Sequence, residues 1–285
     1  MLPAFELLEP KSLDEALAAL ADGGGTPMAG GTNLLPDLRA RGEANGRFIS
    51  LSEIGELRRI DHGAGRVVVG AGTTLTDILR DPAMPTAAPS LVAAAEVFAG
   101  SMVRNAATIG GNICYRSPAA DVVPPLLSLD AEVTLASAGG TRSLALDEYF
   151  LDYRSTAMGP DELLISVSWT PPEPGAANLF RKLGRRKGDA ITVTGVAVTL
   201  AARAGKCSKA RIALGSVAAT VFRAKDAENS LLDKVLTEET IDAAAHSAAD
   251  ACRPIDDIRA SADYRLHTAH VLVRRLLMQA WDQAA

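Results

Sequence analysis

The chain has 285 residues, a length that suits two domains of ordinary size with cores of their own. Hydrophobic residues make up 48% of it and charged residues 22%, which excludes a disordered chain. The net charge is −5 without a long basic segment, so we expect no nucleic-acid partner. The sequence has neither the apolar run of a membrane span nor a signal-peptide profile, so we expect a cytoplasmic protein.

The three cysteines, Cys114, Cys207 and Cys252, lie far apart and form no paired motif. Iron–sulfur clusters and structural zinc sites need cysteines or histidines at short, regular spacings. We therefore expect reduced, mostly buried thiols and no metal site in this chain.

The first predicted unit covers about residues 1–57. Apolar side chains recur at helical spacing after Ser12, which stands three residues before Glu15 as in a capping box. Glycines at 23–25 favour the end of that helix. Strands are predicted on either side of it, over residues 5–8 and 48–51.

A second unit, over about residues 58–172, has a different residue pattern. It opens with a β-rich run punctuated by glycine, and a proline cluster at 171–174 marks its end. The predicted strands and helices of this unit cover residues 66–72, 74–79, 91–98, 132–136 and 163–169.

The remaining residues, 175–285, predict a C-terminal domain. Two β-branched runs, 190–201 and 211–217, flank a short turn and indicate a hairpin within a small antiparallel sheet. Three helical segments follow, over residues 224–232, 238–252 and 263–281.

The segment MAGGTNLL, Met28 to Leu35, is the first candidate binding site. Adjacent glycines let backbone N–H groups approach an anion, and Thr32 and Asn33 add side-chain donors. A pyrophosphate would suit such a loop, although a simple tight turn is the more common explanation of a single segment of this kind. The segment matches neither the Rossmann fingerprint nor the P-loop.

The segment NAATIGGNI, Asn105 to Ile113, has the same kinds of residues about 80 positions later. It again carries small residues, paired glycines and a side-chain amide. Two such glycine loops could hold a dinucleotide from two sides, and FAD lying between two subdomains would require this arrangement.

A resemblance rests on four stretches: MAGGTNLLPDLR, ISLSEIGELRRI, GSMVRNAATIGGNICYRSPAADVVPPLL and SADYRLHTAHVLVRRLL. The chain is similar to the FAD-binding medium subunits of the xanthine dehydrogenase and carbon monoxide dehydrogenase family, the molybdenum hydroxylases. This resemblance implies an α+β fold, with a two-subdomain FAD-binding domain of the vanillyl-alcohol-oxidase (PCMH) type. The C-terminal sheet and helices would form the flavoprotein domain of the family.

The resemblance also implies which residues bind FAD. Met28 to Leu34 and Thr108 to Asn112 would hold the pyrophosphate and the adjoining sugar, with Ser101 and Asp121 nearby and Leu164 against the flavin. The full set is Met28, Ala29, Gly30, Gly31, Thr32, Asn33, Leu34, Ser101, Thr108, Ile109, Gly110, Gly111, Asn112, Asp121, Leu164 and Lys182.

Two of these residues have alternative interpretations. Asp121 could accept hydrogen bonds from ribityl hydroxyls or could cap a following helix. Lys182, in the run FRKLGRRKGDA, is implied to lie near the isoalloxazine ring, but a solvated basic loop is an equal alternative.

The resemblance further implies partners for this chain. A small subunit would carry two 2Fe–2S clusters and a large subunit the molybdopterin cofactor, in a dimer of heterotrimers. FAD in this chain would pass electrons to an external acceptor, and the substrate would be oxidised on the large subunit. We therefore expect no catalytic residue here, and the substrate and the acceptor remain open. The inserted iron–sulfur segment of some 4-hydroxybenzoyl-CoA reductase relatives is missing.

Two other functions remain as alternatives. A self-contained flavoprotein oxidase of the same fold would need its own substrate pocket, and no catalytic grouping is visible. A scaffold that has lost FAD is disfavoured by the intact pairs Gly30-Gly31 and Gly110-Gly111. His267 and His270 share a predicted helical face, but without further ligands in the sequence we expect no metal there.

Overall fold

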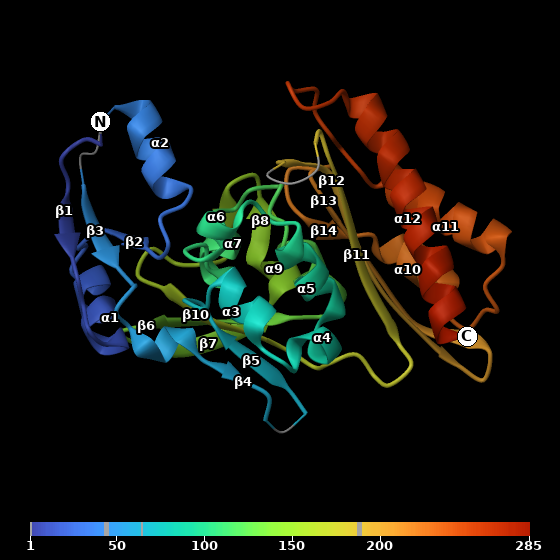
Figure 1. Ribbon diagram of the computed structural model, residues 1–285, viewed down its shortest axis with the longest axis horizontal. Helices are drawn as coiled ribbons and strands as arrows, with labels where there is room; N and C mark the ends of the chain where they lie inside the picture. Colours follow the sequence, from blue (N-terminus) through green and yellow to red (C-terminus); the bar gives the residue numbers. More distant parts are fainter. Residues whose placement is uncertain (1, 43–45, 64, 187–189) are drawn as a thin grey trace.

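The computed structural model describes residues 2–42, 46–63, 65–186 and 190–285, so residues 187–189 of the basic run lie outside the described part. The three larger sheets follow one another along the long axis of the molecule in chain order, and β8 and β9 form a fourth, two-stranded sheet (Figure 1). The first two belong to the N-terminal half, and the third carries the C-terminal helices. No helix of the described residues is long and apolar enough to cross a membrane.

The first sheet is small and parallel, with strand order β1-β3-β2. Ser12 begins the predicted helix by accepting a hydrogen bond from the backbone N–H of Glu15 at 3.2 Å. That helix packs Ala16, Leu17 and Leu20 against Ile49. The elements are β1 (Glu6–Leu8), α1 (Leu13–Ala21), β2 (Thr26–Met28), α2 (Leu34–Arg41) and β3 (Arg47–Ser50).

Helix α2 was not predicted. Leu38 is its one buried residue, so it lacks the apolar stripe by which amphipathic helices are recognised in a sequence. Pro36 in its first turn is compatible with a helix start, because the N–H groups of the first turn have no partner within the helix. The helix ends at Gly42, which adopts a left-handed conformation with φ of 73°.

The second sheet is antiparallel, with strand order β4-β5-β10-β6-β7. It packs against short helices around the largest core of the protein, which includes the fully buried Trp169 and Tyr149. The elements are η1 (Gly55–Arg58), β4 (Ile60–Asp61), β5 (Val67–Gly70), α3 (Leu75–Arg80), α4 (Met84–Ala87), α5 (Pro89–Glu96), α6 (Ser101–Arg104), α7 (Ile109–Cys114), α8 (Val123–Ser128), β6 (Glu132–Ser137), β7 (Gly140–Ala145), α9 (Leu146–Tyr149), β8 (Phe150–Asp152), β9 (Ser155–Thr156) and β10 (Leu163–Trp169).

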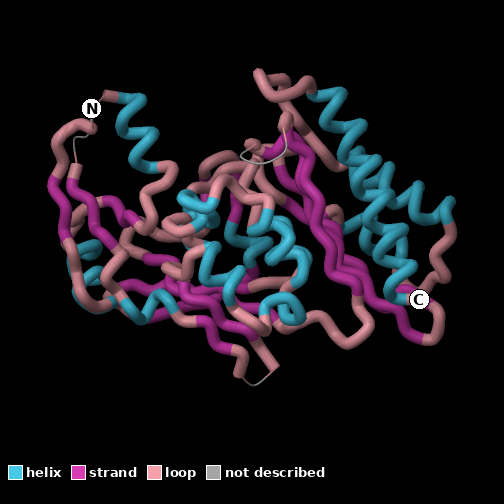
Figure 2. The backbone as a smooth tube through the Cα atoms, viewed as in Figure 1, coloured by secondary structure: helices cyan, strands magenta, loops and turns pink. Residues whose placement is uncertain are grey.

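The third sheet is also antiparallel, with order β11-β12-β13-β14, and it confirms the predicted hairpin and the three helices after it. Helices α11 and α12 lie on one side of it (Figure 2). Helices α5 and α8 of the preceding domain contact the sheet as well, and strand β12 is buried along most of its length. The elements are β11 (Ala177–Gly184), β12 (Thr192–Arg203), β13 (Lys206–Gly215), β14 (Phe222–Arg223), α10 (Lys225–Leu231), α11 (Glu238–Asp250) and α12 (Ala262–Ala284).

Candidate cofactor-binding site

A cleft of about 320 Å³ lies between the first and second subdomains. Both predicted glycine segments line it, one from each side, although they are about 80 residues apart in the chain. The predicted residues on its wall are Met28, Ala29, Gly30, Gly31, Thr32, Asn33, Leu34, Thr108, Gly111 and Asn112.

The first segment follows the carboxyl end of strand β2 and leads into helix α2. Ligands bind at this edge of parallel strands in many α/β folds. Gly30 touches the facing segment so closely that a Cβ atom would lie 1.7 Å from the backbone oxygen of Ala106. Gly31 has φ of +65°, a conformation that side chains with a Cβ rarely adopt. Both glycines are therefore required by the local backbone.

The second segment is not the loop that the sequence predicted, because it forms the first turn of α7. Thr108 caps this helix by accepting a hydrogen bond from the N–H of Gly111 at 2.9 Å. Gly110 packs inward, where a Cβ atom would lie 2.6 Å from that of Ala71. Gly111 instead lines the cleft. The two glycines of this pair therefore differ in role.

Three arginines contribute positive charge to the cleft: Arg41, Arg116 and Arg154. Asp37 is the carboxylate on the described wall, and it accepts a hydrogen bond from the hydroxyl of Tyr115 at 3.1 Å. The excess of guanidinium groups favours an anionic ligand such as a diphosphate. Sequence reasoning missed these residues, because tertiary folding brings them together from separate elements.

Backbone conformation and helix polarity add to this preference. Arg116 and Arg154 adopt left-handed conformations with φ of 57° and 56°, which is uncommon for arginine and concentrates at functional sites. Helix α2 points its N-terminal end at the cleft, and no described side chain caps it. The positive end of a helix dipole attracts anions.

Asn112 carries an unused hydrogen-bonding atom on the wall of the cleft. Its Oδ1 is buried and has no hydrogen-bond partner among the described residues. A buried polar atom without a partner is costly, so this oxygen is suited to accept a hydrogen bond from a ligand hydroxyl.

Cys114 also lines the cleft, where burial raises the pKa of its thiol. A raised pKa keeps the thiol protonated at neutral pH, which disfavours a nucleophilic role. The other two cysteines are buried and free, with burial raising the pKa of Cys207 to about 11 and that of Cys252 to about 12. All three cysteines are free, as predicted, and Cys207 and Cys252 are buried, whereas Cys114 is partly exposed.

Asp121 and Lys182 form a buried ion pair between the two domains. Lys182 Nζ lies 2.6 Å from Asp121 Oδ2, and each side chain is 8% exposed. Thr192 also donates a hydrogen bond to Asp121. Burial raises the pKa of Asp121, while the ammonium group and the two hydrogen bonds oppose that rise.

These contacts overturn both structural alternatives for the pair. Asp121 does not cap helix α8, whose N-terminal residue is preceded by Val122 without any side-chain cap. Lys182 lies on strand β11 and is not part of a solvated loop. Among the described residues, Asp121 and Lys182 do not line the 320 Å³ cleft.

Four other predicted residues also lie off the cleft wall. Ile109 and Gly110 are buried behind it, and Leu164 is packed in the core of the second subdomain. Ser101 is exposed at the start of α6. Most residues predicted to hold the pyrophosphate therefore lie together on the cleft wall. Leu164 and Lys182, which were predicted to lie near the flavin, do not line it.

A second cavity, of about 480 Å³, adjoins the cleft and shares Tyr115 and Arg154 with it. Residues 117–119 of the second subdomain line it together with Ser216 and Arg265 of the C-terminal domain. Ser216 Oγ and Arg265 Nε are buried without a hydrogen-bond partner among the described residues. The two cavities meet at Tyr115 and Arg154 and together reach from the turn after β2 to the C-terminal domain.

A cationic, glycine-lined cleft between two subdomains is typical of proteins that bind a dinucleotide cofactor. Similarity to known proteins identifies that cofactor. Residues 3–169 match the FAD binding domain in molybdopterin dehydrogenase. Residues 178–280 match the CO dehydrogenase flavoprotein C-terminal domain.

Curated relatives are similar over nearly their whole length. The carbon monoxide dehydrogenase medium chain of Hydrogenophaga pseudoflava is 34% identical, over 99% of this chain and 99% of its own. The 6-hydroxypseudooxynicotine dehydrogenase complex subunit alpha of Paenarthrobacter nicotinovorans is 31% identical, over 99% and 96%.

Solved structures agree with these relatives. Carbon monoxide dehydrogenase from Hydrogenophaga pseudoflava, in a form that lacks the Mo-pyranopterin moiety, superposes with a TM-score of 0.96 at 35% identity, covering both chains completely. Quinoline 2-oxidoreductase from Pseudomonas putida 86 gives 0.92 at 32% identity, covering 100% of this chain and 99% of the other. The chain therefore belongs to the family of FAD-binding subunits of molybdopterin dehydrogenases and is an oxidoreductase subunit. The predicted family, fold class and FAD cofactor are confirmed.

Proposed function

We propose that this chain is the FAD-carrying electron-transfer subunit of a heterotrimeric molybdenum hydroxylase or dehydrogenase. It receives electrons from iron–sulfur clusters of a small partner subunit and delivers them to an external acceptor. Substrate oxidation takes place on a large molybdopterin subunit, and two heterotrimers form the complete enzyme. One observation carries the proposal: the described residues build a cationic dinucleotide cleft but no grouping of catalytic side chains beside it.

The residues of the cleft fit the diphosphate and sugar of FAD. Gly111 leaves room for a ligand beside α7, the positive end of α2 faces the cleft, and Arg116 and Arg154 offer charge to the phosphates. The unpartnered Oδ1 of Asn112 is an acceptor for a sugar hydroxyl. Bound FAD supplies the redox chemistry by accepting and releasing electrons.

The adjoining cavity is the proposed place of the flavin ring. It leads from Tyr115 and Arg154 toward the C-terminal domain, the direction in which an extended dinucleotide would continue. Asp121 and Lys182 fix the two domains on either side, so this proposal makes them positioning residues. Ser101 and Leu164 remain FAD contacts only by family resemblance.

Purification of the native complex tests the function. We expect one flavin per chain, two further subunits, molybdenum and about four iron atoms per flavin, as two 2Fe–2S clusters require. A flavin-containing chain that is free of iron and molybdenum and oxidises a substrate by itself would instead be an oxidase. A pure chain without flavin absorbance would be a scaffold.

A Gly111→Val variant tests the cleft itself. The added side chain would crowd Thr108 and the wall of the cleft, so we expect most of the bound FAD to be lost while the fold is kept. Gly55→Val is the matched control, because a Cβ at Gly55 meets open space away from the cleft. A folded Gly111→Val protein with its full flavin absorbance would contradict the assignment.

A further inference from the structure

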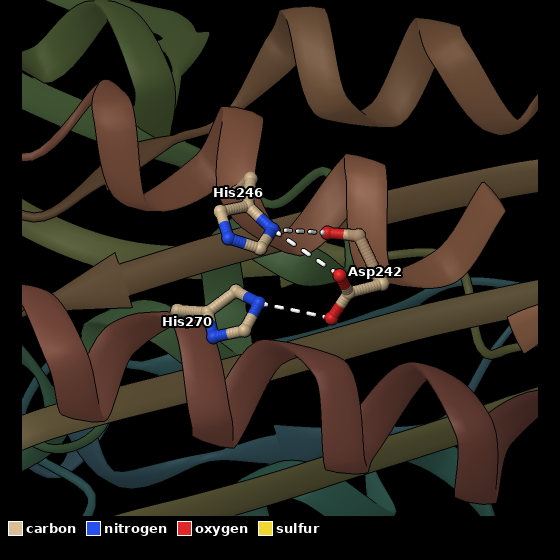
Figure 3. A group of neighbouring side chains, drawn as sticks. All are labelled: Asp242, His246 and His270. Carbon is tan, nitrogen blue, oxygen red and sulfur yellow. Dashed lines mark hydrogen bonds and ion pairs between the residues drawn. The ribbon is translucent and has the colours of Figure 1, made fainter. Parts of the chain in front are cut away.

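Helices α11 and α12 of the C-terminal domain bring two histidines and an aspartate together (Figure 3). Asp242 and His246 lie one turn apart on α11, and His270 comes from α12. The two imidazole rings lie with their centroids 4.0 Å apart, and both face the single carboxylate.

The distances within this cluster are short. His270 Nε2 lies 3.1 Å from Asp242 Oδ1, and His246 Nδ1 lies 3.4 Å from Asp242 Oδ2. The three groups can each offer one ligand atom such that all three atoms lie within 4.8 Å of one another. In a tetrahedral zinc site, bond lengths of about 2.0–2.1 Å place neighbouring ligand atoms about 3.3 Å apart.

We propose that Asp242, His246 and His270 bind one divalent transition-metal ion, with Zn²⁺ as the expected occupant. Two imidazoles and one carboxylate are a ligand set that zinc accepts, and they leave a fourth position for water. Imidazole ligands favour zinc and its neighbours over Mg²⁺ and Ca²⁺, which prefer oxygen. The ion would join α11 to α12.

The surroundings permit the small rearrangement that binding needs. The His246 side chain is 62% exposed, so its ring has room to turn toward a shared ion, in exchange for the present contact of 3.0 Å between its Nδ1 and the backbone oxygen of Asp242. Arg274 Nε lies 3.1 Å from Asp242 Oδ1, and this arginine also pairs with Glu238. Arg274 therefore keeps a carboxylate partner when Asp242 turns to a metal.

A groove of about 490 Å³ beside the cluster gives access from solvent. It shares Asp242 and His270 with the cluster. It is also lined by Glu238 and Glu239, whose charges favour a cation, and by Arg274 and Arg275, whose charges oppose it. None of the three proposed ligands lines the cofactor cleft, so the metal site does not depend on the proposed function.

Calorimetric titration of the full chain with zinc chloride at pH 7.5, after removal of metal by chelation, tests this site. We expect one zinc ion per chain and a higher melting temperature in its presence, because binding to the folded state alone stabilises it. Since changes even to partners outside the ligand shell weaken metal binding by about 10- to 100-fold, His246→Ala and His270→Ala should each weaken it at least about tenfold.

His267→Ala is the matched control, because His267 is exposed on the same helix one turn before His270. It should leave zinc affinity and stoichiometry unchanged, and FAD content should stay constant in every variant. Asp242→Asn keeps the shape of the side chain and should also weaken binding. Equal zinc binding by the His246→Ala/His270→Ala double variant, or loss of binding in His267→Ala, would overturn the proposal.

Discussion

The glycines of the cleft meet different physical demands, although each pair looks alike in the sequence. Gly30 and Gly110 allow two backbone segments to touch, because a Cβ on either would overlap atoms of the facing chain. Gly31 supplies a left-handed turn, and Gly111 lines the cleft. In the second pair, a substitution at Gly110 therefore tests packing, while a substitution at Gly111 tests ligand binding.

Asn112 allows a sharper test at this scale, because its effects on stability and on binding should have opposite signs. Its buried Oδ1 lacks a partner without ligand, so Asn112→Ala should leave the FAD-free chain as stable as before or slightly more stable. FAD affinity should fall about 10- to 100-fold, which corresponds to an unmade hydrogen bond of about 1–3 kcal/mol.

Flavin fluorescence titration and thermal melts of the FAD-free protein measure the two effects. Asn105→Ala is the control, since Asn105 is an asparagine outside the cleft whose Oδ1 accepts a hydrogen bond from Thr76 at 2.6 Å. Unchanged FAD affinity in Asn112→Ala would remove this residue from the site.

At the scale of elements, the cleft depends on a contact between the turn after β2 and the turn before α7. Gly30→Ala should disturb this contact, because the new methyl group would lie 1.7 Å from the backbone oxygen of Ala106 and a backbone must move. Overpacking of this kind costs about 1–3 kcal/mol. We expect a lower free energy of unfolding together with a loss of FAD.

Chemical denaturation and flavin absorbance check this prediction, with Gly55→Ala as the control in open space. The pattern should differ from that of Gly111→Val, which should lose FAD with a smaller loss of stability, because its Cβ meets the Thr108 side chain and not a backbone. A Gly30→Ala protein of normal stability would show that the two turns can separate without cost.

Elements with strong local signals were predictable from the sequence. Ser12 caps α1 as its spacing indicated, and the β-branched runs form the hairpin of β12 and β13. Helix α2 was missed because one buried leucine leaves no periodic pattern. The start of α7 was taken for a loop because its paired glycines have low helix propensity, whereas the cap at Thr108 stabilises the helical turn.

In the candidate site, too, residues with a local sequence signal were predictable and the others were not. The glycine segments were found because backbone approach to a phosphate demands glycine, which is visible locally. Arg116 and Arg154 were not found, because they reach the cleft only through tertiary folding. The proposed metal cluster could not be predicted from the sequence, because its ligands come from two helices. The sequence pairs His270 with His267, whereas in the fold His270 lies beside His246 and Asp242.

At the scale of the whole molecule, two polar contacts hold the C-terminal sheet against the FAD-binding domain. One is the buried pair of Asp121 and Lys182. The other centres on Asp130, which follows α8 and contacts Arg211 and Arg223 at 2.7 and 2.8 Å and Lys209 at 3.0 Å. Because the proposed flavin cavity lies between these domains, their relative position determines its shape.

Burial tends to raise the pKa of Asp130, but hydrogen bonds and charge from Arg211 and Lys209 outweigh it and hold the pKa below its ordinary value. A carboxyl whose pKa is lowered by folding stabilises the fold above its unfolded pKa of about 4. This contribution is lost as the pH falls through the lower, folded value. The fold should therefore depend on Asp130 at neutral pH and not in strong acid.

Asp130→Asn isolates the charge, because asparagine tolerates the left-handed backbone of this residue, with φ of 53°. With the solvent exposure of the carboxylate taken into account, we expect a loss of about 1–2 kcal/mol at pH 7. The difference from the wild type should shrink as the pH falls below about 4. Asp282→Asn, at an exposed aspartate near the end of α12, is the control. A stability difference that is independent of pH would mean that shape, and not charge, holds the two domains together at this position.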